Sequence, residues 1–305
     1  MLSQRIEEYV ALRRALGFKF EYTADLVRAF ARFAHARGDT HVRWRTAVDW
    51  ARQGESKEAA GRRLGAVHKL AHFLRAEDRR HQDIPTRYFR PRGCRPMPYI
   101  YSQAEIATLL AGAAQIEPPG SFRATMFTTL YGLLAVTGLR TSEALRLRVG
   151  DFRDDGLFIH ETKFHKSRWI PLHRTTATAL ESYLDARKRV PCRTDHFFIS
   201  PRTGQAPKYA VVWWTFRSLC ARAGIGIHSP SGRKPRIHDL RHTFAVRALE
   251  RSPSGRDAVE RHTAALSTYL GHTNARYTYW YLHRTPQLLR GIARECERIA
   301  EGGAR

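Results

Sequence analysis

The chain has 305 residues, of which 43% are hydrophobic and 26% are charged, so its composition is that of a folded globular protein and excludes a disordered chain. Its 52 basic residues exceed its 28 acidic residues by 24, which predicts a polyanionic partner, with DNA or RNA preferred over an anionic membrane surface. The sequence has no apolar run of membrane-spanning length, no signal peptide and no cysteine pairs at zinc-binding spacing, so we expect a cytoplasmic protein without a structural metal.

Residues 1–82 predict a small domain of about four helices. Apolar residues recur at helical spacing over residues 6–16 and again over residues 26–34. Trp44 begins a short helix that Gly54 ends, and Ser56 is a suitable N-cap for the helix that follows. This part of the chain is therefore expected to be entirely helical.

A basic, proline-rich segment follows the helical domain. Residues 79–98 contain four prolines and six arginines but one aspartate, so they cannot form a continuous helix. We expect residues 83–98 to be an extended linker that contacts DNA phosphates through Arg87, Arg90, Arg92 and Arg95. A solvated tether that makes no such contacts is the alternative.

A second domain, residues 99–305, begins after the linker. Ser102 is expected to cap a helix over 104–113, and an apolar helix over 122–136 is ended by Gly138. Two short strands are predicted at 157–161 and 168–172, with Lys163 and Lys166 in the turn between them. The rest is helical, so the predicted fold class is mainly α with a small antiparallel β-sheet (α+β).

Two short motifs in this domain bring arginines next to polar partners. In TGLRTSEALRL, Arg140 lies at a junction between two helices and Glu143 is placed to face it. In HDLRHTFAVRAL, His238 and Arg241 share one face of a helix. His238 and His242 also have the spacing of a zinc-binding helix, but Arg241 on that face would repel a dication, so zinc is the weaker alternative.

A third motif, LGHTNARYTYWYLH, combines His272 with three tyrosines, Tyr277, Tyr279 and Tyr281. Aromatic clusters usually pack in a core. Tyrosines this close to a histidine in a very basic protein are also well placed to present a nucleophilic hydroxyl group.

Taken in order, these motifs resemble the tyrosine recombinase (phage integrase) family, and the resemblance covers about residues 99–290. It implies a core-binding domain in residues 1–82 and a catalytic domain in residues 99–305, which together form a C-shaped clamp on DNA. The site residues that it implies are the catalytic Arg140, Lys163, His238, Arg241, His272 and Tyr281, with Glu143 supporting the first arginine.

Two of these assignments have an alternative within the sequence. Family hairpins usually carry the lysine as the earlier one of a Lys-x-x-Lys-x-Arg run, which favours Lys163 over Lys166. The family places its nucleophile nine residues after the histidine of Leu-Gly-His, which selects Tyr281. Tyr277, on the same helical face, is the second choice.

The resemblance implies a site-specific recombinase that cleaves and rejoins duplex DNA through a 3′-phosphotyrosyl intermediate. Two arginines bracket the phosphate, so no metal or cofactor is needed. We expect a homo-oligomer on DNA, a tetramer in the synapse, with partner recombinases possible, working at the bacterial nucleoid to move a mobile element. The alternatives are a DNA-binding protein with an inactive recombinase fold and a type IB topoisomerase-like strand relaxation.

The end of the chain carries an apolar stripe at helical spacing over residues 286–300. The sequence leaves two options open for this segment. It packs either onto its own domain or onto an adjacent protomer.

Overall fold

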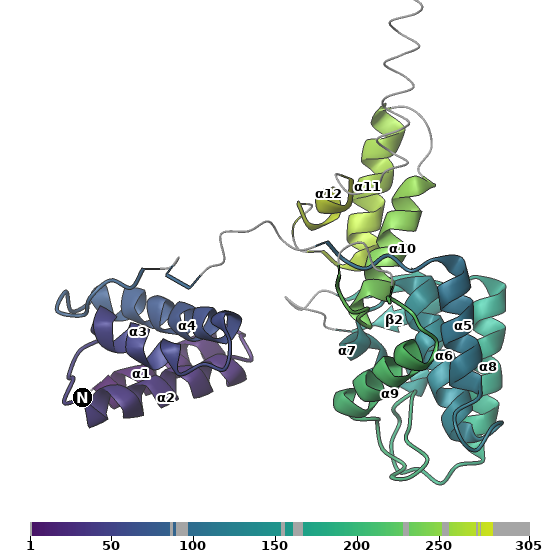
Figure 1. The fold of residues 1–305 in the computed structure, drawn as a ribbon, viewed down its shortest axis with the longest axis horizontal. Helices are drawn as coiled ribbons and strands as arrows, with labels where there is room; N and C mark the ends of the chain where they lie inside the picture. The colour runs from purple at the N-terminus through teal and green to yellow at the C-terminus, as the bar shows by residue number, and fades with distance from the viewer. Residues whose placement is uncertain are drawn as a thin grey trace, which may run out of the picture. The chain divides into compact units, whose positions relative to one another are not determined.

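The computed structural model describes residues 2–85, 88–89, 97–153, 156–160, 167–227, 232–251, 256–272, 274 and 276–282. The chain divides into two compact units, Met1–Pro96 and Met97–Arg305. Helices make up most of both units, and the sheet in the described ranges has three antiparallel strands, which confirms the predicted fold class (Figure 1). Within those ranges, no helix is long and apolar enough to cross a membrane.

The described part of the first unit contains the four predicted helices: α1 (Leu2–Ala15), α2 (Glu21–Ala36), α3 (Trp44–Arg52) and α4 (Lys57–Arg75). Their inward faces form one apolar core, in which Phe30 and Trp50 make an edge-to-face contact at 5.6 Å between ring centroids. The hydroxyl of Ser56 accepts a hydrogen bond from the Ala59 N–H at 3.1 Å, so the predicted N-cap of α4 is confirmed.

The chain after α4 stays attached to this unit for part of the expected linker. Ile84 is 1% exposed in the helical core, and Phe89 packs against the same core. Arg52 donates a hydrogen bond to the Tyr88 hydroxyl at 2.8 Å. The start of residues 83–98 is thus held by apolar packing, whereas Arg87, Arg90, Arg92 and Arg95 lie outside the described residues.

His41, Asp78 and His81 come together beside α4, with ligand atoms within 4.8 Å of one another. The backbone N–H of Val42 donates to Nδ1 of His81 at 3.0 Å, which places the ring proton of a neutral His81 on Nε2. A metal ion would need the lone pair at that Nε2 atom. We therefore interpret His41, Asp78 and His81 as a hydrogen-bonded cluster that links the α2–α3 connection to the chain after α4, rather than as a metal site.

The second unit surrounds a core organised by α6 (Phe122–Thr137), which packs against α5 (Gln103–Ala114), α8 (Arg174–Lys188) and α10 (His238–Glu250). α9 (Tyr209–Arg222) covers another side of α5. Ser102 and Glu105 form a capping box at the start of α5, which fixes the predicted helix start. Gly138 ends α6 with a positive φ of 62°, a conformation that favours glycine.

The sheet lies beside this core and follows the short helices α7 (Thr141–Ala144) and η1 (Val149–Asp151). Its strands run in the order β1 (Phe152–Arg153), β2 (Gly156–Ile159) and β3 (Arg168–Pro171), and Ile159 pairs with Arg168. β2 and β3 correspond to the two predicted strands. β1 has only two residues, too few to show the alternation of polar and apolar side chains that identifies a strand in sequence.

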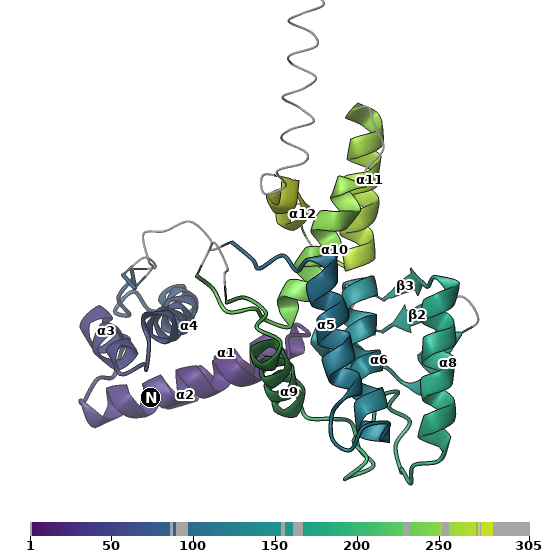
Figure 2. The ribbon, with the colours of Figure 1, turned by 45° about the vertical axis from the view of Figure 1, so that its right-hand side comes forward.

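Three helices at the end of the described chain, α10, α11 (Arg256–Leu270) and α12 (Arg276–Leu282), pack on one another (Figure 2). Their shared apolar cluster includes Leu249, Leu266, Leu270 and Tyr281. The segment 286–300, with its predicted apolar stripe, lies outside the described residues.

Candidate active site

The junction between α6 and α7 holds the first predicted arginine. Arg140 precedes α7, and its backbone N–H donates to Oε2 of Glu143 at 2.9 Å. Its guanidinium donates from Nη1 to Oε1 of Glu143 at 2.6 Å. The side chain of Arg140 is 29% exposed, whereas that of Glu143 is 1% exposed. The predicted pair is therefore present, with the acid buried and the arginine reaching toward solvent.

A second arginine, which the sequence analysis did not select, completes the coordination of Glu143. Arg168 begins β3 and donates from Nη2 to Oε2 of Glu143 at 2.8 Å, with its own side chain 8% exposed. Burial alone would raise the pKa of Glu143, but the hydrogen bond and charge of Arg168, together with Arg140, lower it to about 2. Glu143 is thus a permanent anion that fixes two guanidinium groups.

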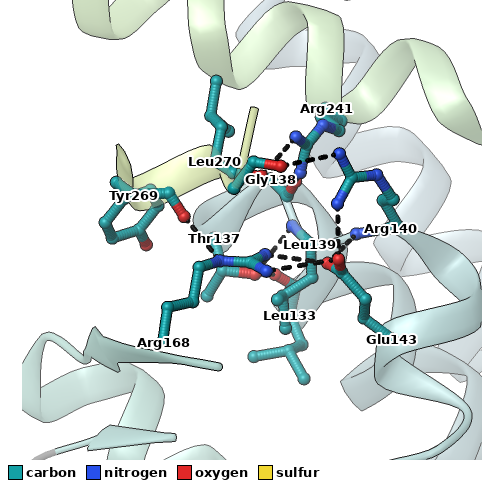
Figure 3. A network of polar contacts seen from close by, with 11 residues as sticks. Leu133, Thr137, Gly138, Leu139, Arg140, Glu143, Arg168, Arg241, Tyr269 and Leu270 are labelled. Carbon is teal, nitrogen blue, oxygen red and sulfur yellow. Dashed lines mark hydrogen bonds and ion pairs between the residues drawn. The ribbon is translucent and has the colours of Figure 1, made fainter. Parts of the chain in front are cut away.

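Three successive backbone carbonyls at the end of α11 each accept a hydrogen bond from a different arginine (Figure 3). The oxygen of Tyr269 is bound by Arg168 at 2.7 Å and that of Leu270 by Arg241 at 2.6 Å. The oxygen of Gly271 is bound by Arg140 at 3.1 Å. Carbonyl groups at a helix C-terminus lack partners within the helix and carry partial negative charge, so three cations are favourable there.

Gly271 is required at this point for a steric reason. Its φ is +64°, and a Cβ atom added to it would lie 2.8 Å from Nη1 of Arg168. A side chain would therefore both strain the backbone and displace the arginine.

Arg241 lies on the inward face of α10 and is 3% exposed. It donates from Nη1 to the carbonyl of Gly138 at 2.8 Å, which ties α10 to the end of α6. Burial, followed by the charge of Arg140, lowers the pKa of Arg241 to about 10, so the group stays charged at neutral pH. Arg140 and Arg241 are thus close enough to act on each other electrostatically while both are held by backbone carbonyls.

The two predicted histidines approach the same arginines. Burial, with the charges of Arg241 and Arg140, lowers the pKa of His272 to about 3, so this ring is neutral at pH 7. Its Nδ1 lies 2.8 Å from the Thr278 hydroxyl. The side chain of His238 is more exposed than that of His272. Desolvation by the surrounding protein and the charge of Arg241 lower the pKa of His238 as well. Both rings are available as neutral hydrogen-bonding groups.

Tyr281 and Tyr277 differ in their exposure to solvent, although they are only four residues apart on α12. Tyr281 is 3% exposed and packs in the cluster formed by α10, α11 and α12. Its hydroxyl lies 2.6 Å from Nδ1 of His242, and its ring stacks on His272 with centroids 6.5 Å apart. Tyr277 is 52% exposed. Of these two tyrosines, Tyr281 is the one whose hydroxyl contacts another side chain of the site.

The structure therefore brings together five predicted residues, Arg140, His238, Arg241, His272 and Tyr281, along with the supporting Glu143. Lys163 and Lys166 lie outside the described residues, between β2 and β3. Sequence reasoning missed Arg168 and considered His242 only as a zinc ligand. Arg168 is the arginine of the Lys-x-x-Lys-x-Arg run, which was the available signal, while no sequence pattern connected His242 with Tyr281.

Comparison with known proteins identifies the same family that the sequence motifs resemble. The phage integrase family matches residues 102–287. The putative integrase/recombinase y4rB of Sinorhizobium fredii is 35% identical over 310 residues, covering 97% of this chain and 96% of that protein. The tyrosine recombinase XerD of Brucella abortus is 29% identical over 269 residues, covering 86% of this chain and 82% of XerD.

Solved structures share the fold. The Tn1549 transposon integrase, in complex with transposon right end DNA, has a TM-score of 0.67 at 17% identity. The match covers 98% of this chain and 99% of the integrase chain. The XerH site-specific recombinase in its post-cleavage complex with a palindromic difH substrate has a TM-score of 0.65 at 20% identity, covering 89% of this chain and 77% of its own.

Proposed function

Because the chain belongs to the phage integrase family and is a tyrosine-type site-specific DNA recombinase, we propose that it cleaves and rejoins DNA strands through Tyr281. The observation that carries this assignment is the buried Tyr281, whose hydroxyl lies 2.6 Å from Nδ1 of His242, whose ring stacks on His272, and which interacts electrostatically with Arg241. The ring of Tyr277 also lies near His272, with centroids 6.1 Å apart, but Tyr277 is 52% exposed.

The charges of the site suit phosphoryl transfer without a metal. The reaction places negative charge on the nonbridging oxygens of the phosphate, and Arg140 and Arg241 supply two permanent cations for them. The neutral rings of His238 and His272 donate further hydrogen bonds to the same oxygens. Attack by the Tyr281 hydroxyl forms a bond to phosphorus and breaks the bond to the 5′ oxygen, which leaves the protein attached to the DNA 3′ end.

The leaving 5′ oxygen needs a proton, and we assign the donor as Lys163, in the connection between β2 and β3. The anchoring of β3 supports this assignment, because Arg168 at its start is fixed to Glu143 by two hydrogen bonds. The start of β3 is thereby held next to Glu143, which also binds Arg140.

Duplex DNA is the proposed partner, and the net charge of +24 supports this proposal.

Related folds were solved as a λ integrase dimer on a core site and as a λ integrase tetramer on a Holliday junction. We propose that this chain likewise assembles on DNA as a homo-oligomer, and that residues 1–82 act as a core-binding domain that closes on the duplex with residues 99–305. The likeness to a transposon integrase supports a role in moving a bacterial element, and we propose that the enzyme works at the nucleoid.

Covalent trapping tests the assignment of the nucleophile. A pool of nicked duplexes with randomised sequence is incubated with the protein in EDTA, and the trapped DNA is sequenced to define a substrate. We expect a protein adduct on the 3′ end that is lost in Tyr281→Phe and kept in Tyr277→Phe, the matched control on the same helix. An adduct that persists in Tyr281→Phe would refute the assignment, and a strict need for Mg²⁺ would refute the metal-free mechanism.

A further inference from the structure

His242 contacts the one atom that has to lose a proton for the proposed reaction to begin. Its Nδ1 lies 2.6 Å from the Tyr281 hydroxyl, the short end of the range for an O–H donor and a nitrogen acceptor. Both residues are almost fully buried, with His242 4% and Tyr281 3% exposed. Bulk water is therefore a poor competitor for this proton.

The arrangement is fixed by packing on both sides. His242 lies on α10 and Tyr281 on α12, and the two helices are in contact over the apolar cluster that includes Val246 and Leu249. The His242 ring also meets the His238 ring edge to face at 4.8 Å. A general base has to be within about 2.6–3.2 Å of the atom that it deprotonates, and His242 meets that condition.

The other histidines of the site are placed for different tasks. His272 stacks its ring against Tyr281 at 6.5 Å between centroids, and its Nδ1 is already paired with Thr278. His238 is the first residue of α10, one helical turn before His242, and its side chain is exposed there. The hydrogen-bond contact that the structure describes for the Tyr281 hydroxyl is the one with His242.

We propose that His242 is a catalytic residue that accepts the Tyr281 proton during cleavage and returns it during rejoining. The neutral ring carries its own proton on Nε2, so the Tyr281 O–H donates to the lone pair of Nδ1. As the hydroxyl oxygen forms its bond to phosphorus, its proton passes to Nδ1, the bond from phosphorus to the 5′ oxygen breaks, and that oxygen takes a proton from the general acid. Reversal of these steps reseals the strand and restores neutral His242.

Several charged and titratable groups surround this pair and influence its proton transfer. They are His238 and Arg241 on α10 and His272 before α12, and the charge of Arg140, before α7, acts on these three groups. Arg241 interacts electrostatically with Tyr281, so its positive charge stabilises negative charge that develops on the phenol oxygen. The proton transfer from the hydroxyl to Nδ1 is favoured by that interaction.

The proposal rests on Tyr281 being the nucleophile, and its test separates the two assignments. The selected duplex is made with a bridging sulfur in place of the scissile 5′ oxygen, because a sulfur leaving group departs without a proton and so removes the contribution of the general acid. Single-turnover cleavage is then followed against pH for the wild type and His242→Asn, whose Oδ1 can replace Nδ1 as a hydrogen-bond acceptor but cannot take the proton. His262→Gln is the matched control, because Nε2 of His262 binds the Ala248 carbonyl in the same helical cluster.

We expect the wild-type rate to rise with pH and reach a plateau. In His242→Asn the rate should fall by about 10²–10⁴-fold and keep rising toward the pKa of a free phenol, near 10. His262→Gln should keep the wild-type profile. A wild-type rate and plateau in His242→Asn would overturn the role of His242, whereas an adduct in Tyr281→Phe would overturn the nucleophile assignment instead.

A second measurement does not depend on the stability of the His242 variant. Nitrogen-15 spectra of the histidine-labelled full-length protein report which ring nitrogen carries the proton. We expect His242 to be neutral with its proton on Nε2, and we expect its Nδ1 signal to shift in Tyr281→Phe. A proton on Nδ1, which would make His242 the donor to the tyrosine, would overturn the proposal.

Discussion

Replacing Glu143 by glutamine should destabilise the catalytic unit far more than the loss of an ordinary ion pair. The pKa of Glu143 falls from an ordinary value of 4.5 to about 2, which corresponds to about 3 kcal/mol of unfolding free energy at about 1.36 kcal/mol per pKa unit. The side chain is 1% exposed, so solvent screens this interaction little. Breaking a buried pair while its partners stay charged costs about 3–5 kcal/mol, in agreement with that value.

Urea dependence of amide hydrogen exchange is the appropriate measurement, because it resolves the catalytic unit from the N-terminal unit within the full chain. Glu143→Gln should lower the stability of the amides of α6 by about 3 kcal/mol. The matched control is Asp195→Asn, which removes an exposed pair with Arg148 (60% and 63% exposed side chains) and should cost at most about 1 kcal/mol. Equal effects of the two substitutions would refute the reasoning.

The pH dependence follows from the direction of the shift. A carboxylate with a lowered pKa stabilises the folded state above its unfolded value of 4.5, and this stabilisation is lost as the pH falls toward about 2. The difference between wild type and Glu143→Gln should therefore be constant at neutral pH and shrink below pH 4.5. A difference that grew on acidification would contradict the assignment.

Three further predictions concern segments that lie largely outside the described residues. Neutralising the linker arginines Arg87, Arg90, Arg92 and Arg95 should weaken binding to all DNA sequences equally and flatten its salt dependence by about 0.9 log unit per lost phosphate contact; an unchanged slope would identify a tether. Lys163→Ala should slow cleavage of the oxygen substrate but not of the sulfur substrate, and the same result for Lys166→Ala instead would move the assignment. Truncation after Thr285 should leave half-site binding intact and abolish cooperative assembly if residues 286–300 dock on an adjacent protomer; a misfolded product would place them in their own domain.

The sequence predicted most of the fold because its local signals act over a few residues. Ser56 and Ser102 cap the helices that they were expected to cap, and Gly138 ends α6. The predicted strands at 157–161 and 168–172 are present with slightly different ends, while β1, with two residues, has no local signature.

The site was less accessible to sequence reasoning, because its chemistry depends on contacts between distant residues. Arg168 binds Glu143 across 25 residues, and His242 binds Tyr281 across 39. The spacing between His272 and Tyr281 could suggest a nucleophile, but only the packing of α12 separates the buried Tyr281 from the exposed Tyr277. A histidine in a helix motif gives no indication of which distant hydroxyl it meets.

The three arginines at the end of α11 have a consequence for affinity. Their guanidinium groups already spend some of their five N–H donors on the carbonyls of Tyr269, Leu270 and Gly271, so a phosphate that displaces such a bond gains only the difference between two sets of hydrogen bonds. Free phosphate or sulfate should therefore be a weak competitor at this site. A phosphate of bound DNA gains negative charge in the transition state, and this charge makes the exchange of hydrogen bonds favourable. The arginines at this helix end therefore bind the transition state more strongly than the ground state, which raises the rate of reaction.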